Sequence, residues 1–410
     1  MSISAKDVGI MLAALGGDPL LPKVQKLEYE GPSPFAPFVP SIIGPCVDDL
    51  DLTYNINDTI PARNENASVE IGMILALKAR RPDAVRTLAI CSPGPILHNH
   101  IIQAMAGWHS LEAIELIGPS VDRCGLAIMA TLPRLKSLHI SFDMDAPEPY
   151  VRKPPAPSDA LRELHMMVWD SRAGRALAML RPHSLISLKV EGVLKADDIR
   201  TLSAYVRRYC GTQSLEALTV CSLFDPMQGE RLVNVRPLVL DDIQPLLSFT
   251  HLIDAHIQFC LVRLTDADLE CIARSWPHLR RLCLYPSRLN LADRPACTLN
   301  SLLSFAQYCP HLGEFQFVVD ATTIVVPDEA SIPFPRAHDK LRALNVMHSP
   351  IDSVKDVASF LTRFFPSIDT GTLLSHSGNG TMEARWASVR MMIPVLLDAR
   401  IVGIHGGGRT

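Results

Sequence analysis

The segment Leu264–Leu284, LTDADLECIARSWPHLRRLCL, carries the side-chain types from which catalytic sites are built. The carboxylate of Asp266 and the imidazole of His278 could act as general acids or bases. The thiols of Cys271 and Cys283 could act as nucleophiles or metal ligands. The same segment has apolar residues at helical spacing and then in strict alternation. Its function therefore depends on whether the polar residues or the apolar pattern is the signal.

The other polar motifs of the chain are incomplete as reactive sites. His98 and His100 lie two residues apart, which is poor ligand geometry on a helix, and no third ligand is evident. Asp143 and Asp145 lack the remaining ligands of a calcium loop. No phosphate-binding loop, nucleophile elbow or HExxH motif occurs, and none of the ten cysteines forms a CxxC pair. We therefore expect no enzyme activity, no catalytic residue, no metal and no cofactor.

Composition excludes further classes. Apolar residues make up 48% of the chain and charged residues 20%, which is typical of a folded protein. The net charge of -4 argues against nucleic acid as a partner. The longest apolar runs, Ile71–Leu77 and Met391–Leu397, fall far short of the roughly 20 residues that span a bilayer, so no membrane role is expected. Scattered cysteines without a signal peptide predict a cytoplasmic or nuclear protein.

A hexamer with the pattern apolar-x-x-apolar-x-apolar recurs along the chain about twelve times. The copies begin at Val24, Val47, Val85, Leu111, Leu135, Leu161, Leu185, Leu215, Leu252, Leu279, Leu312 and Leu341. Residues four and six of each copy fall on the same side of a strand, so both can be buried, and residue one turns inward before the strand. Between copies, residues such as Leu269, Ile272 and Ala273 have the spacing of one buried helix stripe.

This alternation of strand and helix predicts an α/β fold, a leucine-rich-repeat solenoid with a parallel sheet on its concave face and helices on its convex face. We expect the repeats to occupy residues 1–349, and residues 350–410 to form C-terminal capping helices and a disordered tail beginning near Gly403. The proline-rich segment Gly31–Pro45 is expected to cross irregularly between the first two strands. The polar stretch near Asn55–Asn66 and the segment Ser141–Asp159 are expected to be loops.

The fifth residue of each hexamer should point to the concave face, where neighbouring strands lie roughly 4.8 Å apart. His139 and His165 should therefore be lateral neighbours. A surface that recognises a protein partner is predicted there, acidic near its N-terminal end and mixed further along. Its candidate residues are Glu28, Asp51, Glu115, His139, His165, Lys189, His256, Arg281 and Tyr285. Any solvated sheet face must be polar, so these residues also fit a surface without a partner.

The segments Leu264–Leu284 and Leu299–Val319 resemble the cysteine-containing leucine-rich repeats of F-box proteins. Trp276 stands where those repeats usually have Cys, and Cys309 occupies that position in the next copy. The first two hexamers, with their proline-rich crossing, look like the fungal branch of F-box/leucine-rich-repeat proteins. The resemblance covers residues from Pro22 to about Pro366. We expect no F-box within this sequence, because the residues before the first hexamer are too few to hold one; either the gene model is shortened or the protein lacks the module.

The resemblance implies a non-catalytic scaffold for protein–protein interaction, similar to the substrate-recognition subunit of a cullin-type (SCF) ubiquitin ligase. Its partner would be a protein substrate on the concave face, with the ligase scaffold as a second partner if an F-box is restored. A leucine-rich-repeat regulator of an enzyme, such as a GTPase activator or a nuclease inhibitor, is the alternative. No sequence motif separates the two.

Overall fold

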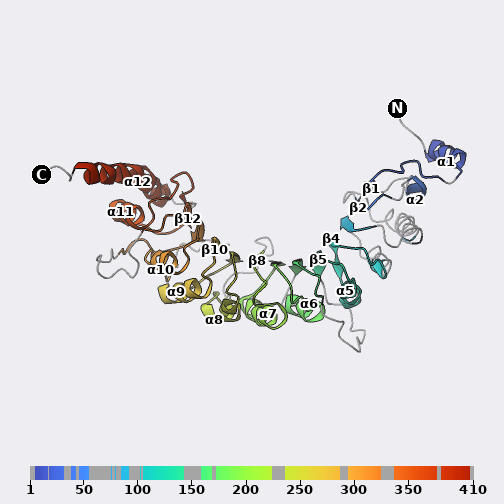
Figure 1. Cartoon of the computed structure of the whole chain (residues 1–410). Helices are drawn as coiled ribbons and strands as arrows, with labels where there is room; N and C mark the ends of the chain where they lie inside the picture. The colour runs from blue at the N-terminus through green and yellow to red at the C-terminus, as the bar shows by residue number, and fades with distance from the viewer. Residues whose placement is uncertain are drawn as a thin grey trace. The chain divides into compact units, whose positions relative to one another are not determined.

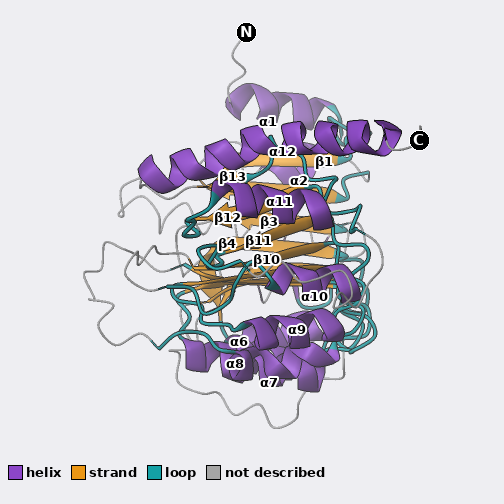
Figure 2. Cartoon of the chain, turned by 90° about the vertical axis from the view of Figure 1, so that its left-hand side faces the viewer, coloured by secondary structure: helices purple, strands orange, loops and turns teal. Residues whose placement is uncertain are grey.

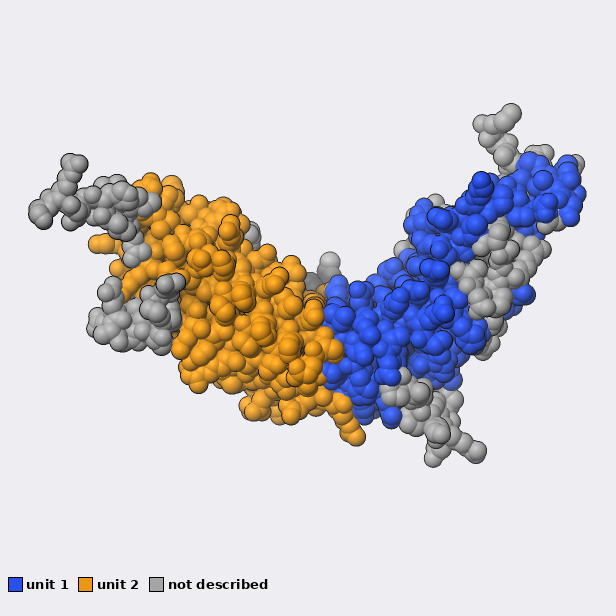
Figure 3. All heavy atoms as spheres, in the orientation of Figure 1, with its two compact units in different colours: residues 1–190, 209–211 blue, residues 191–208, 212–410 orange. Residues whose placement is uncertain are grey.

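Each hexamer of the repeat places its third residue at the start of a strand in the computed structural model (Figure 1). The structure describes residues 5–16, 18–31, 38–42, 46–54, 75, 79, 85–91, 102, 105–142, 158–168, 172–223, 236–286, 294–324, 337–375 and 380–406. Residues 55–66 and most of 141–159, which the sequence predicts to be loops, lie outside them. The chain divides into two compact units, Met1–Val190 with Tyr209–Gly211 and Glu191–Arg208 with Thr212–Thr410 (Figure 3).

The strands of each unit are parallel and follow one another in sequence order, as a leucine-rich-repeat solenoid requires. The first unit holds β1 (Lys26–Gly31), β2 (Asp49–Tyr54), β3 (Thr87–Cys91), β4 (Ala113–Val121), β5 (Ser137–Phe142) and β6 (Glu163–Val168). Strand β7 (Ser187–Gly192) lies at the division. The second unit holds β8 (Ala217–Ser222), β9 (Asp254–Phe259), β10 (Arg281–Pro286), β11 (Glu314–Phe317), β12 (Ala343–Met347) and β13 (Leu374–Ser375).

The segments between strands contain helices wherever their apolar residues have helical spacing. The first unit has α1 (Ala5–Ala14), α2 (Val39–Ile42), α5 (Arg123–Ala130) and α6 (Ala173–Leu180). The second has α7 (Ala196–Tyr209, all but its last residue), α8 (Leu240–Ile243), the 3-10 helix η5 (Gln244–Ser248), α9 (Asp266–Ser275), α10 (Ser301–Tyr308), α11 (Val354–Phe364) and α12 (Gly380–Gly406). Helices α9, α10 and α11 all lie on one side of β10, β11 and β12 (Figure 2).

The core is built from hexamer positions one, four and six. From the second hexamer onward, the described side chains at these positions are at most 5% exposed. In the first hexamer Val24 and Leu27 are half-buried, because that copy has a neighbour on one side alone within its unit. Each fully buried aliphatic side chain contributes roughly 1.5–3 kcal/mol, so several stacked copies are needed for a stable core.

A backbone contact repeats from copy to copy and fixes the register of the strands. In the described copies of each unit, the carbonyl of hexamer position two accepts N–H bonds from positions two and three of the next copy, at 2.7 to 3.2 Å. Arg280, for example, accepts from Gly313 and Glu314. These bonds bring corresponding residues of neighbouring hexamers side by side, whatever the length of the segment between them.

Helix α9 shows why its sequence forms a helix at this position. Thr265 caps it, accepting from the N–H of Asp268 at 3.2 Å while the Asp268 carboxylate accepts from the Thr265 N–H at 2.8 Å. Asp266 is the first helical residue, as predicted, and its carboxylate accepts from the Thr298 N–H and hydroxyl at 2.6 and 2.7 Å. Asp266 therefore connects two neighbouring copies.

Two expectations on irregular segments need correction. The crossing from the first to the second strand contains one helical turn, α2, in which Pro40 occupies the second position, where its missing N–H costs nothing. Helix α12 runs on through Gly406, so residues 403–406 are helical, and the rest of the expected tail lies outside the described residues.

The expected terminal helix is confirmed: Trp386 and Val389 of α12 are buried, and the Trp386 indole donates to the Ser349 carbonyl at 2.9 Å.

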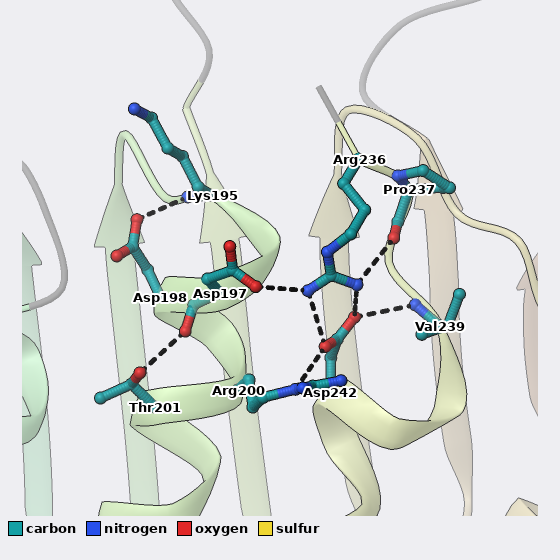
Figure 4. A network of polar contacts seen from close by, with 9 residues as sticks. All are labelled: Lys195, Asp197, Asp198, Arg200, Thr201, Arg236, Pro237, Val239 and Asp242. Carbon is teal, nitrogen blue, oxygen red and sulfur yellow. Dashed lines mark hydrogen bonds and ion pairs between the residues drawn. The ribbon is translucent and has the colours of Figure 1, made fainter. Parts of the chain in front are cut away.

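A buried carboxylate connects α7 to α8 in the second unit (Figure 4). Asp242 is 0% exposed and accepts two bonds from Arg236, at 2.8 and 2.9 Å, and one from Arg200 at 3.0 Å. Its fourth bond comes from the Val239 N–H at 3.1 Å. Burial acts to raise the pKa of Asp242, but the hydrogen bonds from Arg236, Val239 and Arg200 outweigh it and hold that pKa below its ordinary value.

Candidate interaction surface

The side of each sheet opposite the buried positions forms the surface that hexamer positions three and five build, here called the sheet face. Strands β7 and β9 alternate regularly between half-buried and buried residues, and the half-buried ones are positions three and five. Buried neighbours hold each strand from below, so the polar side chains of the sheet face stand in fixed rows.

Within each unit the fifth positions of adjacent hexamers pair directly. In the first unit the pairs run from Glu28 to Asp51, from Asp51 to Ala89, and so on to His139 and His165. In the second unit His256 pairs with Thr219 on one side and with Cys283 on the other. The predicted row of position-five residues is therefore present in both units. Lys189 is half-buried at position five of β7, at the division.

The two predicted histidine neighbours are in contact. The rings of His139 and His165 stack with their centroids 3.9 Å apart and their planes inclined by 16°. Glu115, at the same position of the preceding strand, lies with Oε1 2.8 Å from Nδ1 of His139. Side-chain exposure falls from 47% at Glu115 to 22% at His139. Glu115, His139 and His165 therefore form a contiguous row of interacting side chains across three adjacent strands.

The N-terminal end of the sheet face is acidic, as the sequence predicts. Lys26 bonds Glu28 at 2.7 Å, and this hydrogen bond, with the attraction of Glu28, Asp49 and Asp51, raises the pKa of Lys26. The same hydrogen bond lowers the pKa of Glu28, whose side chain is 70% exposed. Both groups are therefore charged at neutral pH. The carboxylates of β2 lie beside them, and neither β1 nor β2 contains a second lysine.

The sheet face of the second unit is mixed in charge and contains aromatic rings. Arg281 forms an ion pair with Asp254 on the neighbouring strand. The Tyr285 hydroxyl donates to Gln258 at 2.9 Å, and its ring lies 5.5 Å from that of His256. These contacts hold Arg281 and Tyr285 in place on adjacent strands. The sheet face of the second unit therefore differs in chemical character from the acidic first strands.

The thiol of Cys283, central in this row, is unsuited to covalent chemistry. Burial, followed by the charges of Asp254 and Glu314, raises the pKa of Cys283 to about 11. A thiol with such a pKa stays protonated near neutral pH, whereas the reactive form is the thiolate.

Within the described residues, no group of three or more His, Cys, Asp or Glu side chains could hold a metal ion. The described helices include none long and apolar enough to cross a membrane.

Three residues of the sheet face were not selected from the sequence. Lys26 sits at position three of the first hexamer, Gln258 lies two residues beyond position five of β9, and Met347 lies likewise on β12. The Sδ atom of Met347 accepts from the Gln316 amide at 3.2 Å. The alternation of a strand would have identified all three, because residues two apart share a face.

Comparison with known proteins leaves the identity of the chain open. No protein-family model matches the sequence, and no curated protein matches it. An internalin (inlF) from Listeria monocytogenes is similar in structure, with a TM-score of 0.40 and 11% identity over 91% of this chain and 88% of the internalin. The leucine-rich repeat domain of APL1B has a TM-score of 0.34 and 11% identity over 91% of this chain and 93% of that domain.

The class of the protein therefore follows from its own geometry. Parallel strands in sequence order, hexamers in register and buried positions one, four and six define a leucine-rich-repeat protein. Nothing in the comparisons names a particular member of that class.

Proposed function

We propose that the chain is a protein-interaction scaffold whose sheet face in the first unit binds a basic segment of a partner protein. The observation that carries the proposal is the charge at positions three and five of β1 to β6. A single lysine, Lys26, stands there among five carboxylates. Those carboxylates are Glu28, Asp49, Asp51, Glu115 and Glu163.

The arrangement of these charges favours binding over mere solubility. Across β1 and β2, Glu28 lies opposite Asp51, whereas Lys26 lies opposite Asp49 and bonds Glu28. One lysine among three carboxylates at these four positions leaves net negative charge there, which a cationic partner would neutralise. Complementary charge of this kind speeds association and selects the partner, and its effect weakens as salt is raised.

The finer proposal is that the scaffold serves as a substrate-recognition subunit of a cullin-type ubiquitin ligase. It is supported by the sequence resemblance of Leu264–Leu284 and Leu299–Val319 to the repeats of F-box proteins. In this role the sheet face would bind the substrate, and no residue of the chain would take part in ubiquitin transfer.

The test compares the full chain with a charge-reversed variant, Glu28→Lys with Asp51→Lys. Proteins that co-purify with the wild-type chain are identified by mass spectrometry, purified and titrated against both. We expect at least one partner with a basic segment to bind the variant about tenfold more weakly, and less tightly to the wild-type chain at higher salt. The matched control is Glu383→Lys with Asp398→Lys, two exposed carboxylates of α12, which should leave binding unchanged.

The proposal fails if every confirmed partner binds the charge-reversed variant as tightly as the wild-type chain. The ligase role has a separate readout. Partners recognised through the sheet face should co-purify with cullin-type ligase subunits, and their half-lives in cells should lengthen when the chain is deleted. Unchanged half-lives would reject the ligase role and leave the scaffold intact.

A further inference from the structure

A cavity of about 530 Å³ lies beyond the C-terminal ends of β9, β10, β11 and β12 in the second unit. Its walls come from the segments that follow these strands, including Leu264, Ala296 and His348, and from Phe317 at the end of β11. Its volume falls within the range of roughly 300–1,000 Å³ that small-molecule sites occupy. The cavity is distinct from the sheet face, since none of the candidate partner residues lines it.

The charges on its walls are all of one sign. Arg263 and Arg294 both line the cavity, and no Asp or Glu of the described chain does so. Within the described part of the chain, neither guanidinium has an ion pair or a side-chain hydrogen bond. Other arginines, such as Arg236 and Arg281, are paired with carboxylates. Two unpaired guanidinium groups at one cavity, in a chain of net charge -4, form a local site for an anion.

The cavity exists because a second row of backbone contacts is interrupted here. After the strands, parallel bridges join Leu238 to Val262 and Thr298 to Asp320. Among the described residues, no such bridge joins Val262 to the segment before Thr298, and the side chain of Asp266 connects these two copies instead. Both of these segments contribute to the cavity lining, the first through Arg263 and the second through Arg294.

The rest of the lining is suited to an apolar body. Apart from Arg263, Arg294 and His348, every lining side chain is apolar or a thiol, among them Leu264 and Phe317. Burial lowers the pKa of His348, so its imidazole is neutral at physiological pH and the two arginines carry the positive charge of the lining. A ligand that fits this lining has an anionic end and an apolar remainder.

We propose that this cavity binds a carboxylate carried on an apolar body, with Arg263 and Arg294 holding the carboxylate and Leu264 and Phe317 contacting the apolar part. Guanidinium groups bind carboxylates through paired, charge-assisted hydrogen bonds, which are stronger than bonds between neutral groups. Two sources share this chemistry, namely a free organic acid and the C-terminal carboxylate of a peptide that ends in an apolar residue. The proposal is independent of the function assigned to the sheet face.

The test titrates the full chain with two matched pairs of probes by calorimetry. The first pair is 2-naphthoic acid and its neutral amide. The second is acetyl-Gly-Gly-Leu with a free carboxylate and the same peptide with a C-terminal amide. We expect at least one acid to bind about tenfold more tightly than its amide, because the amide cannot form the charge-assisted pair. Binding by the first pair alone indicates a free acid, and binding by the second alone indicates a peptide end.

Three variants locate the binding. Arg263→Gln with Arg294→Gln should remove the preference for the acid, and Ala296→Phe, at an exposed lining position, should fill the cavity and block both acids. Arg175→Gln, at an exposed position of α6 in the first unit, should change nothing. The proposal is overturned if neither acid binds at millimolar concentration, if acid and amide bind equally, or if the arginine variant keeps the preference. Thermal unfolding verifies that Ala296→Phe is folded. If it is not, the loss of acid preference in the double arginine variant is the test of the proposal.

Discussion

The thiol of Cys309 donates to the carbonyl of Trp276 at 3.4 Å, and the two residues occupy the same position in consecutive repeats, three residues before the hexamer. The Cys309 thiol lies equally close to the Ala273 carbonyl, and Trp276 contacts the carbonyl at that same repeat position one copy earlier, where its indole donates to Leu246 at 3.2 Å. In the following copy His338 holds this position, with Nε2 3.0 Å from the Cys309 carbonyl. The thiol, the indole and the imidazole thus each place a polar side-chain group beside a buried carbonyl of the preceding copy.

Replacement of Trp276 by Phe tests this role. Trp276→Phe removes one of the two bonds that the buried Leu246 carbonyl accepts, the other coming from the Phe249 N–H at 3.1 Å, and Trp108→Phe is the matched control. Both indoles are 0% exposed, but the Trp108 nitrogen has no partner within the described residues. Since both changes remove the same ring volume, Trp276→Phe should cost about 1–2 kcal/mol more than Trp108→Phe in chemical denaturation. Equal costs would mean that the indole bond is not part of the stability of the repeat.

Asp242→Asn should destabilise the second unit by about 1–3 kcal/mol, because it weakens the charge-assisted hydrogen bonds from Arg236 and Arg200, while the partly exposed Arg236 keeps its ion pair with Asp197. The folded pKa of Asp242 lies below its ordinary value of 3.8, so its contribution is present above that pH and is lost as the pH falls through the folded pKa. The difference in unfolding free energy between wild type and variant should therefore shrink below about pH 4. Asp241→Asn, an exposed carboxylate of the same helix, should give little change at any pH, and urea titrations at several pH values measure both.

The two faces of β10 predict opposite responses at adjacent residues. Leu282 is 0% exposed, and Leu282→Ala should cost about 2–5 kcal/mol by leaving a cavity under the sheet. Cys283 points to the sheet face, so Cys283→Ala should cost less than about 1 kcal/mol. Guanidinium denaturation of the full chain compares them. Similar costs at the two positions would contradict the assignment of faces.

Gly125 predicts a substitution that local propensity would misjudge. Alanine is a better helix former than glycine, yet a Cβ at Gly125 would lie 2.8 Å from Ile102 Cδ1 and from Val121 Cγ1. The stiff Val121 side chain cannot easily move, so Gly125→Ala should destabilise the first unit by about 1–3 kcal/mol. Gly313→Ala, whose Cβ would meet carbonyl oxygens at 3.7 and 3.8 Å, should be close to neutral. A thermal melt in which Gly125→Ala unfolds at a higher temperature than the wild-type chain would refute this explanation.

The sequence predicts the repeating part of the fold because that part obeys one local rule. The spacing of a hexamer such as Leu279–Leu284 predicts which residues are buried and which face solvent. Strand β10 and the row containing His139 and His165 therefore follow from spacing alone. The irregular parts have no such rule. The cavity walls at Arg263 and Arg294 come from segments whose path depends on contacts between copies, and no spacing between those two arginines indicates that they share a site. Asp242 was likewise missed, because its partner Arg236 lies in a loop segment.

The carbonyl at hexamer position two accepts two N–H bonds whatever side chain it carries, from Gln25 to Gly313. Neighbouring repeats are therefore joined through main-chain atoms that a substitution leaves in place. Proline is the one residue that these bonds exclude from positions two and three, because it has no backbone N–H. Provided that positions one, four and six stay apolar, the other residues of a repeat and the length of the segment between hexamers can then vary without loss of the stacking of the repeats. The architecture can be inherited while the sequence drifts beyond recognition.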